Sequence, residues 1–184
     1  MTRRIYITGA AGTGVSSLGR ALAQRLHVSH ADVDDGYWCE AVPPFVTKRS
    51  KDDRRNLLAQ QTGAGGWVLS GCVEGWGEDL IAEADLIVFL MVPTPIRMDR
   101  LMRREREDHG RRILPGGDMC VGYERLIAWA AQYDDPDFKG RNMYRQEAWL
   151  ERQTTPVLRL GGTLPMMRLV NKVMDHKAVR RTYA

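Results

Sequence analysis

The stretch that decides the fold is Gly9-Ala10-Ala11-Gly12-Thr13-Gly14-Val15-Ser16-Ser17. It follows a short apolar run, Ile5–Thr8, and leads into a helical pattern of apolar residues that ends near Leu26. Glycines 9 and 14 and serine 16 fit the spacing G-x-x-x-x-G-K-[ST], in which backbone N–H groups converge on phosphate oxygens. The sequence therefore predicts a phosphate-binding loop at residues 9–17. The alternative, a glycine-rich turn of a dinucleotide-binding fold, needs a G-x-G-x-x-G order that these glycines do not give.

One position departs from the phosphate-loop pattern, because Val15 stands where the lysine belongs. That lysine supplies positive charge at the β- and γ-phosphates during phosphoryl transfer, and its loss costs several kcal/mol of transition-state stabilisation by analogy with other electrostatic groups. Either an arginine from elsewhere replaces the charge, or the chain binds nucleotide with little turnover. Ser16 keeps the hydroxyl that ligates Mg²⁺ in such loops.

Composition excludes several classes of protein. The chain has 184 residues, of which 43% are hydrophobic and 27% charged, and this fits one domain, 1–184. Its longest apolar run, Leu86–Pro93, is far shorter than the roughly 18 residues of a membrane span. The cysteines, Cys39, Cys72 and Cys120, are odd in number and widely spaced, as expected of reduced thiols in a cytoplasmic protein. The net charge of +4 comes without a basic patch interleaved with aromatics, so we do not expect a nucleic-acid partner. The oligomeric state stays open.

Apolar runs alternate with helical patterns along the chain. The runs are Ile5–Thr8, Val28–Val33, Trp67–Ser70, Leu86–Val92 and Val157–Leu160. Helix-like spacing occupies about 16–26, 52–62, 77–84, 94–107, 119–132, 142–152 and 165–176, and 178–184 is expected to be a frayed tail. Short apolar strands separated by helices indicate a parallel sheet covered on both faces. We predict a three-layer α/β fold with a five-stranded parallel sheet, whose ligands bind at the carboxyl ends of the strands.

Two Pro- and Gly-rich stretches interrupt this alternation, at about 36–51 and 108–118. We expect both to be loops over the active end, the first on the substrate side and the second as a lid. Trp38 and Phe45 lie in the first of these loops, and Trp76 lies in the glycine-rich segment 71–77 after the third apolar run. All three are candidates to wall an acceptor pocket. Packing between the loops is the alternative.

Three carboxylates cluster at the end of the second apolar run. Asp32 and Asp34 are two residues apart, so that on a strand both face the same way, and Asp35 follows directly. Such a cluster opposite a phosphate-binding loop suits Mg²⁺ coordination and removal of a proton from an acceptor. A helix cap or a polar turn is the alternative.

Arginines crowd the stretch before and within the predicted lid, at positions 97, 100, 103, 104, 106, 111 and 112. Most are expected to be solvated and paired with nearby acidic residues. One or two that reach over the phosphates would supply the missing charge.

These features resemble the P-loop kinases of small molecules, the group of adenylate, shikimate and gluconate kinases. The resemblance runs from about Arg4 to Met174 in a fixed order: a P-loop, D-x-D after the second strand, a glycine turn after the third, an arginine-rich lid, and a late Gly161-Gly162 loop. The strings D-x-D-D-x-Y-W, P-P-F-x-x-K-R and P-G-G-D-M are similar in particular to uncharacterised adenylate-kinase-like proteins.

The resemblance implies ATP and Mg²⁺ as the bound groups, with residues 9–17 around the phosphates. It implies that Ser16 and Asp32 support the metal, while Asp34 and Asp35 orient an acceptor hydroxyl. Lid arginines Arg104 and Arg111 would stabilise the transferred phosphoryl group. It further implies substrate contacts from Trp38, from Gly71 and from Arg54, with Arg55 as the alternative to Arg54. It also implies a nucleotide contact from Gly161. A nucleoside monophosphate is the alternative acceptor, and a nucleotide-binding protein without useful turnover is the alternative function.

Overall fold

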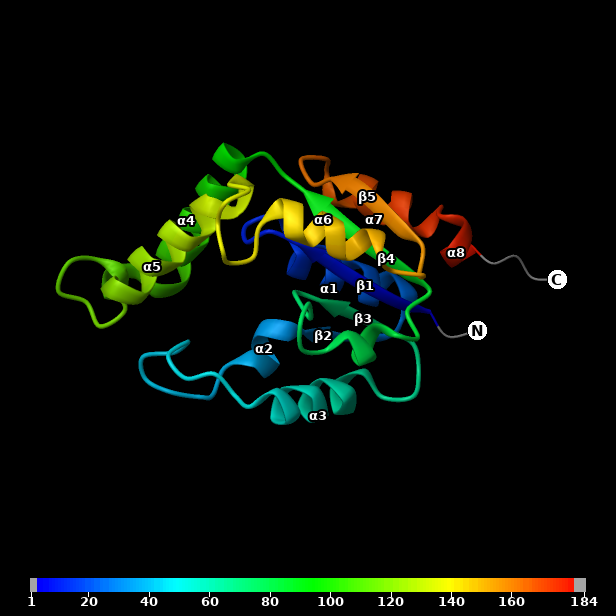
Figure 1. Ribbon diagram of the computed structural model, residues 1–184, viewed down its shortest axis with the longest axis horizontal. Helices are drawn as coiled ribbons and strands as arrows, with labels where there is room; N and C mark the ends of the chain where they lie inside the picture. The colour runs from blue at the N-terminus through cyan, green and yellow to red at the C-terminus, as the bar shows by residue number, and fades with distance from the viewer. Residues whose placement is uncertain (1–2, 181–184) are drawn as a thin grey trace.

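The computed structural model describes residues 3–180 and is organised around a five-stranded parallel sheet (Figure 1). The strands follow the order β2-β3-β1-β4-β5 across the sheet. Their bounds are Arg4–Gly9 (β1), Ser29–Asp32 (β2), Trp67–Ser70 (β3), Leu86–Met91 (β4) and Val157–Gly161 (β5). All five lie in the runs predicted from the sequence, and the three-layer α/β fold is confirmed.

Helices cover both faces of the sheet. Their bounds are Val15–Leu26 (α1), Val33–Tyr37 (α2), Lys51–Thr62 (α3), Thr94–His109 (α4), Cys120–Ala131 (α5), Met143–Glu151 (α6), Met166–Met174 (α7) and Lys177–Arg180 (α8). Three 3₁₀ turns add Glu78–Ile81 (η1), Gly110–Ile113 (η2) and Gln132–Asp134 (η3). Among residues 3–180, no helix combines the length and the apolar character that crossing a membrane requires.

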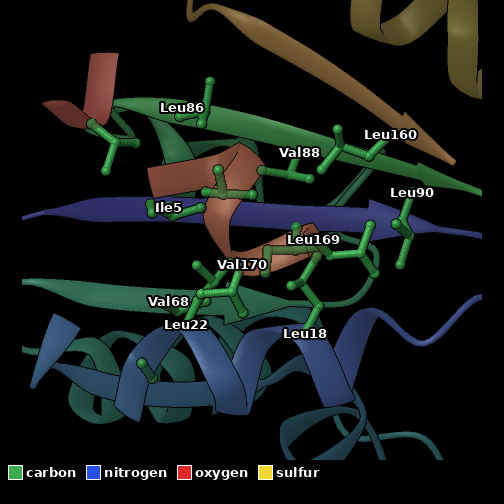
Figure 2. Close-up of a cluster of buried hydrophobic side chains, with 14 residues drawn as sticks. Ile5, Leu18, Leu22, Val68, Leu86, Val88, Leu90, Leu160, Leu169 and Val170 are labelled. Atoms are coloured by element: carbon green, nitrogen blue, oxygen red, sulfur yellow. The ribbon is translucent and has the colours of Figure 1, made fainter. Parts of the chain in front are cut away.

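Alternation along the strands divides the core into two halves. Ile5, Val68 and Val88 point to one face, where they meet Leu18 and Leu22 of α1 and Leu169, Val170 and Val173 of α7 (Figure 2). Tyr6, Leu69 and Phe89 point to the other face and pack with Leu58 of α3 and with Trp149 and Leu150 of α6. Because the strands are apolar on both sides, the sheet is buried between two helical layers.

Two of the predicted elements differ in the structure. Residues 77–84 do not form a helix, because only the 3₁₀ turn η1 bridges them, and one turn is enough to bury Ile81. Part of the tail expected at 178–184 is ordered as the end of α8, where Val179 is 2% exposed and belongs to the core. Residues 181–184 lie outside the described residues.

Helices α4 and α5 form a hairpin that projects beyond the sheet and carries the lid (Figure 1). Its base is held by Arg97, whose side chain is fully buried. The guanidinium donates to the Ala130 carbonyl (2.6 Å) and to Thr94 Oγ1 (3.0 Å), and its Nη2 lies 3.6 Å from Asp134 Oδ1. Burial lowers the pKa of Arg97, and Asp134 acts against that shift. Arg97 therefore ties the first turn of α4 to the end of α5 and does not reach toward a phosphate.

Candidate active site

The phosphate-binding loop connects β1 to α1 at the carboxyl edge of the sheet. The loop is braced by Thr13, whose Oγ1 donates to the Ala10 carbonyl at 2.7 Å. Helix α1 begins after Gly14, which is left-handed (φ 94°) and offers no side-chain cap. The first N–H groups of a helix have no partner within the helix and attract anions. The structure thus leaves an uncapped helix N-terminus where the sequence predicts nucleotide phosphates.

The loop lies directly against the base of the lid. Gly12 has φ +81°, and a Cβ atom built on it would come within 2.1 Å of the Arg97 carbonyl oxygen. Only glycine satisfies both the backbone conformation and the close approach. The geometry of the loop is therefore coupled to the first turn of α4.

Replacing Gly12 with alanine should abolish nucleotide binding, because the new methyl group must displace either the loop or the Arg97 backbone. We expect ATP-analogue affinity to fall at least about 100-fold. Isothermal calorimetry of the variant measures this directly. Gly110→Ala is the matched control, because Gly110 also has positive φ but a Cβ atom built on it would meet nothing within 4 Å. Unchanged affinity in Gly12→Ala would contradict the coupling.

Val15 occupies the lysine position but points its side chain into the fold. It is half-buried and packs against the cluster of Leu18, Leu90 and their neighbours. The adjacent Ser16 is partly exposed and Ser17 is exposed, both on the first turn of α1. The side chain that usually reaches the phosphates is thus replaced by one that stabilises the core.

Asp32 ends β2 and caps the short helix α2. Its Oδ1 accepts from the Asp34 backbone N–H (3.1 Å) and its Oδ2 accepts from Ser70 Oγ (3.2 Å). Ser70 Oγ in turn lies 2.9 Å from His30 Nε2. The expectation that Asp32 and Asp34 share a strand face was wrong, because the chain turns into a helix at Val33. The cap is the local cause, since an Asp side chain can satisfy an early N–H of the helix.

Asp34 and Asp35 lie in the first turn of α2. Burial and the neighbouring Asp32 raise the pKa of both carboxyls. Arg141 and Arg104 act against this rise at Asp34, whereas His30 and Arg20 do so at Asp35. Asp34 is thus the carboxyl on which the charges of Arg141 and Arg104 act, and its raised pKa suits a general base better than an ordinary aspartate.

A cavity of about 290 Å³ opens between α2 and the substrate-side loop. Its walls include Asp34, Asp35, Trp38, Phe45 and Arg49. The loop is ordered by backbone pairing, since Cys39 N donates to Thr47 O and Arg49 N donates to Tyr37 O. Two of the three predicted aromatic walls, Trp38 and Phe45, line the cavity, and Trp76 is not among the residues that do.

Trp76 packs instead against the guanidinium of Arg54. The Arg54 side chain is buried, its Nε donates to the Arg49 carbonyl (2.8 Å), and its guanidinium lies over the Tyr37 ring (4.0 Å) and the Trp76 ring (5.1 Å). These contacts fix the base of the substrate-side loop. Arg54 is next to the cavity but is not one of its lining residues.

Gly71 shapes the turn after β3. It has φ +126°, and a Cβ atom built on it would lie 2.5 Å from Val33 Cβ, so that the turn and α2 approach each other only because this residue is glycine. The buried Tyr6 hydroxyl donates to the Gly71 carbonyl (2.9 Å) and accepts from the Val73 N–H (3.2 Å). The turn is therefore held rigidly beside Asp32–Asp34.

The lid arginines have different environments. Arg100 donates to the Gly162 carbonyl (3.0 Å), next to Gly161 at the exposed end of β5. Arg104 contacts Glu105 through Nη2 (2.6 Å) and is near enough to Asp34 to lower its pKa. Arg111 is exposed in η2, past the end of α4. Of the two lid arginines predicted to act on the phosphoryl group, Arg104 is the one whose charge acts on Asp34.

The sequence reasoning missed Arg141, which precedes α6. Its pKa is lowered by burial but raised overall by Cys72, Tyr133 and Asp34. No run of arginines marks it in the sequence. The one available signal was its position before Asn142, a residue that caps α6 by accepting from the Arg145 N–H (2.8 Å). A capped helix after the lid would place that residue back at the carboxyl edge of the sheet.

The donors near the loop fit a magnesium ion that arrives with a nucleotide. Within residues 3–180, no group of three or more His, Cys, Asp or Glu side chains could hold a metal by itself. Mg²⁺ is usually held by substrate phosphates, waters and one or two protein oxygens. The Ser16 hydroxyl and the Asp32 carboxylate are oxygen donors of that kind.

Comparisons with known proteins agree with this geometry. The AAA domain family matches residues 5–120. A Bacillus subtilis (strain 168) protein, "Uncharacterized protein YqaC", is 37% identical over 177 residues, which cover 96% of this chain and 98% of that protein. A shikimate kinase from Acinetobacter baumannii in complex with shikimate aligns over 100% of this chain and 97% of its own, at 16% identity and a TM-score of 0.60. A gluconokinase from Sinorhizobium meliloti 1021 aligns over 97% and 92%, at 18% identity and a TM-score of 0.54. The two structures share the fold of this chain.

Proposed function

The chain belongs to the AAA domain family, and from that premise we propose that it transfers the γ-phosphoryl group of ATP to a hydroxyl of a small-molecule acceptor. The observation that carries the proposal is the arrangement of two sites at one edge of the sheet. One is the uncapped loop at residues 9–17, and the other is the cavity that contains Asp34. Phosphoryl transfer needs a phosphate cradle and an acceptor pocket side by side.

In this proposal Asp34 is the general base. The acceptor hydroxyl attacks the γ-phosphorus, its proton passes to the Asp34 carboxylate, and the bond to the bridging oxygen breaks to release ADP. Asp35 helps to orient the acceptor, and Trp38 and Phe45 contact its body. Arg104 faces the charge that develops on the phosphoryl oxygens, and Arg111 would join it when the lid covers the nucleotide. Arg54 and Gly71 support the acceptor side by fixing the loop and the turn.

Mg²⁺ bound through the phosphates, Ser16 and Asp32 would supply neutralising charge at the β- and γ-oxygens. The raised pKa of Asp34 supports its role as base, and its short distance along α2 from the Asp32 cap supports a common site for metal and acceptor. The aromatic side chains that line the cavity, Trp38 and Phe45, favour an acceptor with an apolar or cyclic body.

Calorimetric titration with β,γ-imido-ATP, with and without Mg²⁺, tests the nucleotide part of the proposal. We expect a micromolar Kd that decreases when Mg²⁺ is present, because the ion bridges the phosphates and the protein. The corresponding GTP analogue shows whether the protein prefers adenine or guanine as the nucleobase. Absence of binding by both analogues would refute the proposed function.

A second candidate function is nucleotide binding without useful turnover, and Val15 is the observation that favours it. Val15→Lys separates the two possibilities. A large gain in turnover over the wild type would support the second function, whereas a loss or no change would mean that the wild-type site already contains the needed charge.

A further inference from the structure

Arg141 precedes α6 and is a cation whose hydrogen-bonding capacity is not fully used. Its Nε is buried and has no hydrogen-bond partner. Its guanidinium lies 5.3 Å from the centre of the Trp129 ring, on helix α5 of the lid. None of the salt bridges among residues 3–180 involves Arg141. A buried donor without a partner destabilises the folded protein, and more so when the group is charged.

The neighbours of Arg141 place it where the two proposed sites meet. Burial raises the pKa of Asp34, of Tyr6 and of Tyr133, and the charge of Arg141 acts against that rise at all three. Tyr6 lies on β1, which leads into the phosphate-binding loop, and Asp34 lies at the mouth of the cavity. The residue thus lies beyond the carboxyl ends of the central strands, on a segment that returns from the lid.

Three arginines of α4 already donate to acceptors within the protein. Arg97 donates to the Ala130 carbonyl, Arg100 to the Gly162 carbonyl, and Arg104 to Glu105. The P-loop position that normally supplies the charge is Val15, whose side chain packs in the core. Arg97 Nε is also buried without a partner within residues 3–180, but the rest of that guanidinium is bound at the base of the α4–α5 hairpin. Arg141 is the arginine that combines such a donor with an electrostatic effect on Asp34.

We propose that Arg141 is a catalytic residue that binds an oxyanion, namely the transferring phosphoryl group, and supplies the positive charge that a P-loop lysine supplies elsewhere. This inference rests on the proposed function. The guanidinium stays protonated throughout, donating to a phosphoryl oxygen while the bond to ADP breaks and the bond to the acceptor oxygen forms. The alternative ligand of Arg141 is an anionic group, such as a carboxylate, on the acceptor itself.

Hydrolysis of ATP in the absence of an acceptor distinguishes these two ligands, because water then receives the phosphoryl group. In Arg141→Met we expect kcat for hydrolysis to fall about 100-fold or more. β,γ-Imido-ATP should still bind, whereas affinity for ADP with aluminium fluoride, which mimics the transferring group, should fall by a similar factor. Arg141→Lys should retain part of the rate, and Arg168→Met, an exposed arginine of α7, should retain all of it.

The double variant Arg141→Met/Val15→Lys gives the decisive comparison. If the two positions supply the same charge, Val15→Lys should raise kcat for hydrolysis at least about tenfold in the Arg141→Met background. In the wild-type background it should give no gain. Thermal unfolding of each variant shows whether it is folded.

Normal hydrolysis by a folded Arg141→Met protein would overturn the inference and assign the guanidinium to the acceptor, leaving the proposed function intact. A loss of hydrolysis that Val15→Lys does not restore, together with unchanged affinity for ADP with aluminium fluoride, would also overturn it. A wild-type protein that binds no ATP analogue would refute the proposed function itself.

Discussion

Asp34→Asn should reduce phosphoryl transfer about 10³-fold and leave the affinity for β,γ-imido-ATP within about twofold of the wild type. The amide keeps the size of the side chain but cannot accept the acceptor's proton. The phosphate-binding loop is formed by other residues, so nucleotide binding should persist. Transfer is measured as ADP formed in a screen of hydroxyl-bearing acceptors, and binding is measured by calorimetry.

Asp35→Asn is the matched control, because it removes a carboxylate from the same turn and the same cavity wall. It should weaken acceptor binding more than it slows transfer. The pH profile adds a second readout. The pKa of Asp34 is raised by burial and by Asp32, so kcat/KM in the wild type should rise with pH through a value above that of an ordinary aspartate. Full activity in Asp34→Asn would show that Asp34 is not the general base. The same rise of kcat/KM with pH in that variant would show it too.

The second large effect concerns stability. Arg97→Met should lower the free energy of unfolding by about 3 kcal/mol, because the buried Ala130 carbonyl and the Asp134 carboxylate lose their partner. Methionine fills much of the volume but donates no hydrogen bond. For a domain of this size the change corresponds to a decrease in Tm of roughly 10 °C.

Urea unfolding followed by circular dichroism measures the difference for Arg97. Arg103→Met, an exposed arginine on the same helix, should change the free energy of unfolding by less than about 0.5 kcal/mol. Equal stability of the two variants would mean that the lid base does not depend on the Arg97 contacts.

The strands were predictable from the sequence because each is a short apolar run with helical patterns on either side. The 3₁₀ turn at Glu78–Ile81 was not predicted, because the segment after Gly77 has helical composition but forms only a single short turn. Helix α2 was missed for a related reason. A five-residue helix has no periodicity to detect, and its one signal is the Asp32 cap, which also fits a strand end.

The nucleotide half of the site was easier to predict than the acceptor half. The phosphate-binding loop is contiguous, so that its spacing alone indicates its geometry. The acceptor half is assembled from α2, the loop around Trp38 and Phe45, the turn at Gly71, and the segment before α6. A cluster of arginines in the sequence does not show which of them can reach a ligand. Arg97 shares a helix face with Arg104, but its side chain is buried and donates to the Ala130 carbonyl. Arg141 lies outside every cluster of arginines and is identified only by its buried, unpartnered Nε.

The strand order has a consequence for how the two halves of the site respond to local opening. The loop at residues 9–17 extends from β1, which is flanked by β3 and β4 in the middle of the sheet, whereas Asp32 and Asp34 follow β2, which lies at one edge. Edge strands exchange their amide hydrogens sooner than central strands, because fewer contacts must break to expose them. Under the proposed function, the acceptor side could therefore open and accumulate sequence change while the phosphate-binding loop stays folded, so that one scaffold could acquire new acceptors and keep its phosphoryl donor.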